Sequence, residues 1–262
     1  MEPASKSQPI EIKTLHAVED FRECVDLQRD VWNFAEVDLV PIRMFVVAEK
    51  VGGHIIGAYD GGTIIGFALA VPGVRGNQSY LHSHMLAVRA DYRNRGLGRS
   101  IKLFQREHAI KQGFDLIEWT FDPLEIKNSH LNIERLGVIV RRYNINQYGI
   151  TSSPLQGGLP TDRLIAEWWL QSRRVETLLR SGSHPPITVE EVIEVPGAIY
   201  AWKATDADRP RAVQVQLENR QTFLKAFHDG LAVLGYERDG SGCGRFLLGR
   251  WDEDWTLVEP HE

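Results

Sequence analysis

A short segment rich in arginine and glycine places the strongest constraint on the fold. It reads Arg93-Asn94-Arg95-Gly96-Leu97-Gly98-Arg99-Ser100 and follows residues 80–88, which are predicted to form a strand. Residues 97–112 come next, and their apolar side chains repeat at helical spacing. Glycines let a backbone approach a ligand closely, and the first amides of a helix have no partner within it. Because the helix dipole and three arginines add positive potential, the segment is predicted to bind a pyrophosphate.

Two common nucleotide-binding loops do not fit this segment. A Walker loop needs four residues between its glycines and then Lys followed by Ser or Thr, whereas Arg99 follows Gly98 directly. The dinucleotide fingerprint needs a third glycine where this chain has Ile101. The pyrophosphate therefore belongs to another kind of ligand.

The residues around the segment predict an α/β domain. A strand is expected over 10–15, helices over 17–32 and 41–51, and a hairpin of strands 54–59 and 63–71 around Asp60-Gly61-Gly62. Strand 80–88, loop 89–95, helix 97–112 and strand 115–121 then form a βαβ crossover. Such a crossover places two parallel strands side by side, with the loop at a carboxyl end where ligands bind.

The rest of the chain divides at a linker-like stretch, residues 181–186, which is rich in Ser, Gly and Pro. Before it we expect a helix over 128–137, strands over 138–148 and 163–170, a turn-rich loop over 151–160 and a helix over 171–180. After it, helical spacing joins Val213, Leu217, Leu224, Phe227 and Leu231, and an apolar run covers 246–248. The expected domains are 10–180 and a C-terminal α+β accessory region, 181–262.

The loop resembles that of the GNAT superfamily of acyl-CoA-dependent N-acyltransferases. The family loop reads Arg or Gln, two residues, Gly, one residue, Gly or Ala, and Arg93, Gly96 and Gly98 match it. The order of elements over residues 10–150 is similar too. The resemblance implies a GNAT-type α/β (α+β) fold: a mixed, mostly antiparallel central sheet with a parallel βαβ unit at the CoA site. It also implies acetyl-CoA or another acyl-CoA as cosubstrate, with no metal.

The resemblance also implies roles for individual residues. The backbone of Leu86, Ala87 and Val88 would pair with the pantetheine arm, and Asn128 would contact the pantetheine or the thiol end. The pyrophosphate would be held by Arg93, Asn94, Arg95, Gly96, Leu97, Gly98, Arg99 and Ser100. The family often places a Tyr about seven residues after that Asn, where this chain has Arg135, so the general acid is unassigned.

Two histidines are candidates for the general base. His82 and His84 are two apart, so on a regular strand they share one face with Leu86 and Val88. The run around them resembles a strand of arylalkylamine N-acetyltransferases, where paired histidines remove the amine proton. An imidazole with a pKa near 6.5 can take that proton directly or through water. A packing role, or two-thirds of a metal site, are the alternatives.

Other candidates carry open alternatives. Tyr143 and Tyr148 either protonate the departing thiolate or pack on the sheet. Glu118 either acts as a base, orients His84, or pairs with an arginine inside the sheet. The neighbouring arginines Arg141 and Arg142 either hold an acceptor carboxylate or form ion pairs.

Composition narrows the class of protein. The chain has 262 residues with a formal charge of −5, which argues against a general nucleic-acid binder. Its only cysteines, Cys24 and Cys243, exclude a disulfide framework, and Cys24 lies on an apolar helix face that favours packing over an acyl-enzyme. Residues 1–10 lack a signal-peptide pattern, and no apolar run approaches the roughly 20 residues of a membrane span. We expect a cytoplasmic protein without a membrane partner, and a homodimer is compatible with the sequence.

These observations predict an enzyme, an N-acetyltransferase that moves an acetyl or other small acyl group from CoA to a primary amine. The amine of a small molecule attacks directly in a ternary complex. One alternative is an amino-acid N-succinyltransferase, which would need arginines such as Arg141, Arg142 and Arg163 near the thioester. The other is a non-catalytic acyl-CoA sensing or binding module.

Overall fold

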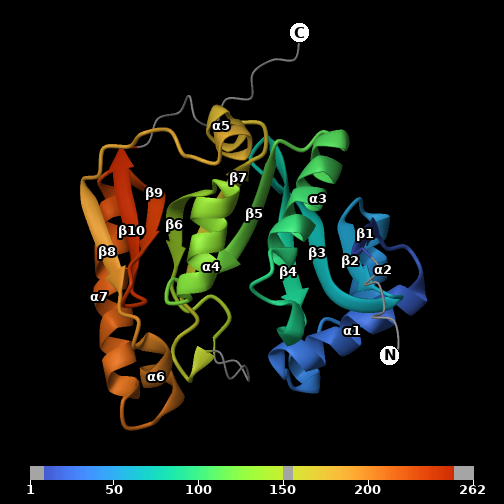
Figure 1. Cartoon of the computed structure of the whole chain (residues 1–262), viewed down its shortest axis with the longest axis horizontal. Helices are drawn as coiled ribbons and strands as arrows, with labels where there is room; N and C mark the ends of the chain where they lie inside the picture. Colours follow the sequence, from blue (N-terminus) through green and yellow to red (C-terminus); the bar gives the residue numbers. More distant parts are fainter. Residues whose placement is uncertain (1–8, 150–155, 251–262) are drawn as a thin grey trace, which may run out of the picture. The chain divides into compact units, whose positions relative to one another are not determined.

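The computed structural model describes residues 9–149 and 156–250 (Figure 1). The chain forms two compact units, Met1–Phe114 and Asp115–Glu262. The predicted boundary near residue 181 lies inside the second unit. Of the predicted loop 151–160, residues 151–155 lie outside the described residues.

The first unit is a four-stranded antiparallel sheet with helices on both faces. Its strands are β1 (Glu11–Thr14), β2 (His54–Asp60), β3 (Thr63–Arg75) and β4 (Gln78–Val88), in that order across the sheet. Its helices are α1 (Val18–Trp32), α2 (Ile42–Lys50) and α3 (Leu97–Lys111), with 3-10 turns at Glu36–Asp38 and Ala90–Tyr92. The predicted hairpin is confirmed, because Gly61 and Gly62 supply φ angles of 56° and 86° between β2 and β3.

The two faces of this sheet bury different helices because side chains alternate along each strand. Ile55, Phe67 and Met85 pack with α1 and α2, whereas Ile56 and Ala68 pack with Leu97 and Ile101 of α3. Figure 1 shows α3 crossing the sheet next to β4. Residues 89–96, which include the 3-10 turn Ala90–Tyr92, connect the end of β4 to the start of α3.

The second unit is a six-stranded sheet in which every described pairing is antiparallel. Its strands are β5 (Leu116–Phe121), β6 (Ile139–Asn144), β7 (Arg163–Trp169), β8 (Glu191–Val195), β9 (Leu231–Arg238) and β10 (Gly244–Arg250), in the order β5-β7-β6-β9-β10-β8. Its helices are α4 (Ile126–His130), α5 (Arg173–Ser181), α6 (Ile199–Ala204) and α7 (Arg209–His228). A π-helical turn, Leu131–Arg135, follows α4. The predicted α/β class with mostly antiparallel strands is thus confirmed.

The C-terminal region differs most from the expectation. The helical spacing to Leu231 is wrong at its end, because Gly230, with a φ of 81°, ends the turn after α7 and Leu231 begins β9. Leu217 and Leu224 are each 40% exposed, and the buried side of α7 includes Phe223 and Ala226 instead. Strands β8 and β9 and helix α6 were not expected. Among the described residues, no helix is long and apolar enough to cross a membrane.

Candidate functional site

The arginine-glycine segment forms the start of α3. Gly96 precedes the helix with a φ of 85°, and a Cβ there would meet no atom within 4 Å. Glycine is thus favoured by backbone conformation rather than by lack of space. Ser100 N donates to Gly96 O at 3.0 Å where the helix begins, so the amides of Leu97 and Gly98 lie in the first helical turn, ahead of this bond. Asn94, with a φ of 59°, bends the chain just before.

The arginines of this segment do different things. Arg93 donates from Nε to Val88 O at 2.9 Å and from Nη2 to Val31 O at 3.4 Å, so its guanidinium ties the loop to the end of β4. Arg95 is exposed, and its guanidinium lies 5.8 Å from the centre of the Tyr92 ring. The loop therefore has one arginine that fixes it and one that faces solvent at the helix start.

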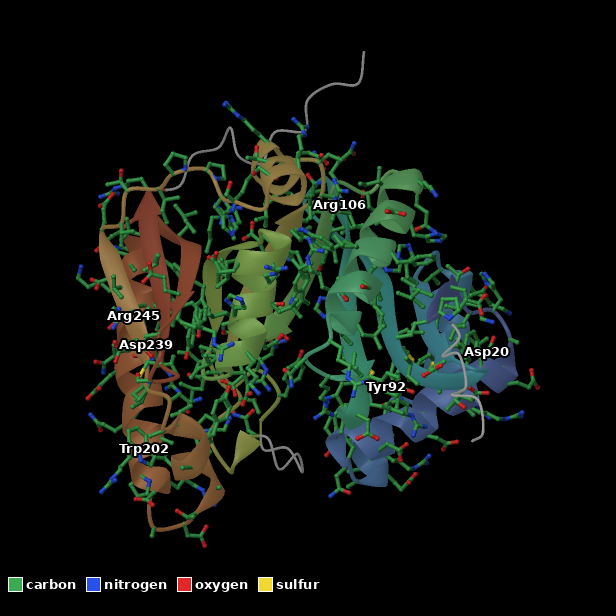
Figure 2. All side chains as sticks on the ribbon, viewed as in Figure 1. Asp20, Tyr92, Arg106, Trp202, Asp239 and Arg245 are labelled. Carbon is green, nitrogen blue, oxygen red and sulfur yellow. The ribbon has the colours of Figure 1, made fainter. Side chains whose placement is uncertain are left out.

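A cavity of about 360 Å³ opens beside Arg95. In it the Tyr92 hydroxyl (labelled in Figure 2) donates to Asp60 Oδ2 at 2.6 Å, and this hydrogen bond raises the pKa of Tyr92. The cavity is lined by Ile10, Ile12, Asp60, Tyr92, Arg95, Leu97 and Ser100. A flat group bound at the helix start would have room here.

A β-bulge decides where the two histidines point. Ala70 pairs with Ser83 and Leu69 with Met85, so His84 is an extra residue on β4. His82 pairs with Val71, which packs against the α1 and α2 cluster. The rings of His82 and His84 lie 6.1 Å apart, so the two imidazoles are neighbours.

The predicted face of the histidines is wrong for the same reason. Leu86 and Val88 pack on the α3 side, whereas His82, opposite Val71, lies on the α1 and α2 side with the His84 ring beside it. A regular strand would place all four on one face, but the extra residue reverses the alternation. His84 is exposed, yet the protein atoms around its ring lower its pKa by desolvation, so the ring is neutral near pH 7.

The other predicted CoA contacts divide between the units. Leu86, Ala87 and Val88 lie at the end of β4, where they pair with Ala68, Phe67 and Gly66. Asn128 lies on α4 in the second unit and is exposed, as is Arg135 at the end of the π-helical turn.

The two tyrosines have different surroundings in the second unit. Tyr143 is buried and donates to Asp162 Oδ2 at 2.5 Å, and Arg220 binds the same carboxylate at 2.8 Å. Desolvation and the Asp162 carboxylate raise the pKa of Tyr143, so its phenol holds its proton firmly. Tyr148 is 46% exposed, with its hydroxyl 3.0 Å from Thr120 Oγ1. Tyr148 is therefore the more accessible phenol.

Glu118 is ion-paired inside the sheet, as one alternative expected. It accepts a hydrogen bond from Arg142, whose Nε also lies 3.3 Å from Glu167 Oε1. Arg141 Nη2 lies 2.6 Å from Glu167 Oε2. A bulge between Val140 and Tyr143 lets both arginines reach the same carboxylate.

Burial decides between the two roles considered for Cys24. Cys24 is fully buried, and desolvation raises the pKa of its thiol, which opposes a nucleophilic role. Within residues 9–149 and 156–250, no group of three or more His, Cys, Asp or Glu side chains is arranged to hold a metal ion.

Sequence reasoning missed a buried polar cluster formed by Ser83, Lys102 and Gln105. Periodicity carried no signal for it, because Lys102 lies about 100° around the helix from Ile101, outside the predicted apolar face of Leu97, Ile101 and Phe104.

Comparisons with known proteins place this geometry in context. Residues 17–136 match the family model of the acetyltransferase (GNAT) family. A comparison with curated proteins found no match. Among solved structures, the chain is similar to an N-acetyltransferase from Staphylococcus aureus Mu50, with 14% identity and a TM-score of 0.51, covering 62% of this chain and 99% of that one. It is also similar to yncA from Salmonella typhimurium, solved with its cofactor acetyl-CoA, with 13% identity and a TM-score of 0.50, covering 62% and 95%. At these identities the likeness concerns the fold.

Proposed function

We propose that this protein is an N-acyltransferase that moves an acetyl group from acetyl-CoA to a primary amine of a small molecule. Residues 17–136 match the family model of the acetyltransferase (GNAT) family, which supports the proposal. The yncA structure, which has the same fold, holds acetyl-CoA. The observation that carries the proposal is the start of α3, where the amides of the first helical turn follow Gly96 beside exposed Arg95. This arrangement suits the diphosphate of CoA.

Each predicted contact then has a proposed task. The amides of Leu97, Gly98 and Arg99 bind diphosphate oxygens, and the backbone of Leu86 to Val88 binds the pantetheine arm. Arg93 keeps the loop closed against the end of β4, because its guanidinium is bound to Val88 O. Asn128 contacts the arm or the thiol end from α4.

The histidines are proposed to prepare the amine. An alkylamine is mostly protonated at neutral pH and must lose a proton before or during attack. His84 suits this task because its pKa lies below the ordinary value, so the ring is unprotonated and can accept. His82, 6.1 Å away between ring centres, can receive the proton through water.

Departure of the CoA thiolate needs less assistance from the protein than deprotonation of the amine. The amine nitrogen forms its bond to the thioester carbonyl carbon, the carbon–sulfur bond breaks, and CoA leaves as a thiolate. Since a thiol has a pKa near 8.5, the thiolate can leave without an acid. If a donor takes part, Tyr148 is the proposed one, because Tyr143 is held by Asp162.

Calorimetry with CoA tests the loop assignment. We expect Gly96→Glu to weaken CoA binding at least about a hundredfold, roughly 2.7 kcal/mol, because a carboxylate would stand at the anion site. The matched control is Gly113→Glu, because Gly113 follows the other end of α3 with a φ of 83° and equally open space. Both variants carry the same strain and charge, so equal CoA affinities would remove the basis of the assignment.

Turnover is tested separately with an amine panel and acetyl-CoA, with free thiol as the product measured. Thiol release that depends on the amine supports the enzyme. CoA binding without release from any amine would favour the non-catalytic binding module.

A further inference from the structure

Three polar side chains are buried between α3 and β4 in the first unit. Ser83 is 5% exposed, Lys102 2% and Gln105 fully buried. Lys102 Nζ donates to Ser83 Oγ at 2.7 Å and to Gln105 Oε1 at 3.1 Å. The Ser83 hydroxyl donates to the same Gln105 oxygen at 3.2 Å. We call these residues the Ser83 network.

An amine in this place is costly. Desolvation lowers the pKa of Lys102 well below its usual range. Apolar side chains of similar volume would fill the space at less cost, since a buried polar group needs all its partners in place. A network of this kind fixes which residues face each other, because any displacement leaves its atoms unpaired.

The Ser83 network lies next to the bulge of β4. Ser83 lies immediately before His84, the extra residue of the β4 bulge. If the bulge moved by one residue toward the start of β4, Ser83 would become the extra residue in place of His84. Ser83 would then leave Lys102 and Gln105, so the network opposes that movement.

We propose that the Ser83 network is a positioning device that holds the bulge at His84 and so keeps both imidazoles on the α1 and α2 side of the sheet. Ser83 faces α3, the adjacent His82 faces the opposite side, and His84 stays beside it. The importance of the network for turnover rests on the proposed role of His84 as base. The position of the ring can be measured without turnover.

The test uses the full chain with isotope-labelled histidine, followed by NMR. His84 is assigned from the spectrum of His84→Gln. We expect Ser83→Ala to weaken the proton–proton contact between the His82 and His84 rings. We also expect it to move the His84 titration midpoint by about half a pH unit or more, because the desolvation of that ring depends on its place.

Three further variants complete the experiment. Ser79→Ala makes the same change at an exposed position on β4 and should alter neither signal, and Ser83→Thr keeps the hydroxyl and should restore both. If Ser83→Ala does not fold, the double variant Ser83→Ala/Lys102→Met decides, since it leaves no unpaired amine. In that variant the ring contact is the readout, because loss of the Lys102 amine itself changes the local charge.

Two results would overturn the proposal: an unchanged ring contact and midpoint in the variant that folds, or equal changes in Ser79→Ala. CoA calorimetry on the same samples separates this outcome from the proposed function. The proposal about the Ser83 network can be wrong in a protein that still binds CoA. It can also be right in a protein that turns over no amine.

Discussion

His54 shows how one buried residue can set the pH dependence of stability. It begins β2, is 1% exposed, and its Nε2 lies 2.7 Å from Gln112 Oε1. An amide oxygen only accepts, so Nε2 carries a proton. Desolvation lowers the pKa of His54 to about 4, although the hydrogen bond to Gln112 opposes this. The neighbouring His108 ring, 4.7 Å away, adds to the lowering.

We predict that stability falls as the pH drops from 6.5 toward 4. The unfolded chain, in which the pKa of His54 is near 6.5, binds the proton in this range, whereas the folded protein does not. The difference is worth on the order of 3 kcal/mol, fully present above pH 6.5. Urea unfolding at pH 7 and at pH 4.5 should show a smaller loss in His54→Gln than in the parent protein. His228→Gln, at an exposed position, is the control, and equal losses in all three proteins would contradict the prediction.

Spacing alone predicted the local conformation of the loop, because the positive φ of Gly96 depends on the nearby backbone. That Arg93, Gly96 and Gly98 bind CoA stays a prediction. The difference between Tyr143 and Tyr148 could not be found in this way, because Asp162 and Arg220 come from distant segments.

At the scale of elements, two β-bulges account for two of the differences from the predicted periodicity. Strands were predicted over 80–88 and 138–148. The first is confirmed as β4, but the second is wrong at its end, because β6 stops at Asn144 and leaves Tyr148 outside it. Each contains an irregular register that no pattern of period two contains. In β4 the bulge moves the histidines to the other face from Leu86, and in β6 it brings Arg141 and Arg142 to one carboxylate.

The β6 bulge leads to a prediction about Glu167. This carboxylate is 2% exposed and accepts from both arginines, so Glu167→Gln should lower the free energy of unfolding by about 2 kcal/mol. Glu194→Gln is the control, because Glu194 pairs at 3.2 Å with Arg245 (labelled in Figure 2) at an exposed site. Urea denaturation measures both, and a Glu167→Gln protein as stable as the control would show that the paired arginines contribute nothing.

At the scale of the whole molecule, local composition and long-range pairing place the C-terminal region differently. Composition predicts a separate accessory region over 181–262, whereas strand pairing joins β9 to the sheet of the second unit. The Ser, Gly and Pro of residues 181–186 correctly predicted a connecting segment after α5, but such residues mark a turn as readily as a domain boundary. Val140 of β6 pairs with Val233 of β9, and the Tyr236 amide donates to Glu134 Oε1 at 2.6 Å. These contacts make the C-terminal region part of the second unit's own sheet, which no local pattern reveals.

Substitution of Lys203 tests whether the C-terminal region is an integral part of the second unit or an appendage. It lies on α6, is 6% exposed, and its Nζ lies 2.7 Å from Glu125 Oε1 and 3.6 Å from Asp122 Oδ2, both between β5 and α4. Desolvation lowers the pKa of Lys203, but the two carboxylates outweigh it and the pKa is raised.

Lys203→Met should therefore leave two carboxylates without their cation and lower the free energy of unfolding by about 3 kcal/mol. Lys225→Met is the matched control, because Lys225 pairs with Asp229 at 2.6 Å on the exposed side of α7 and its loss should change little. Hydrogen exchange read strand by strand distinguishes the two views. In an integral region, Lys203→Met speeds exchange in β5 and β7 as well as in β9 and β10, because all four strands belong to one sheet. Faster exchange confined to residues 181–250, with β5 and β7 as protected as in Lys225→Met, would mean that the C-terminal region is an appendage after all.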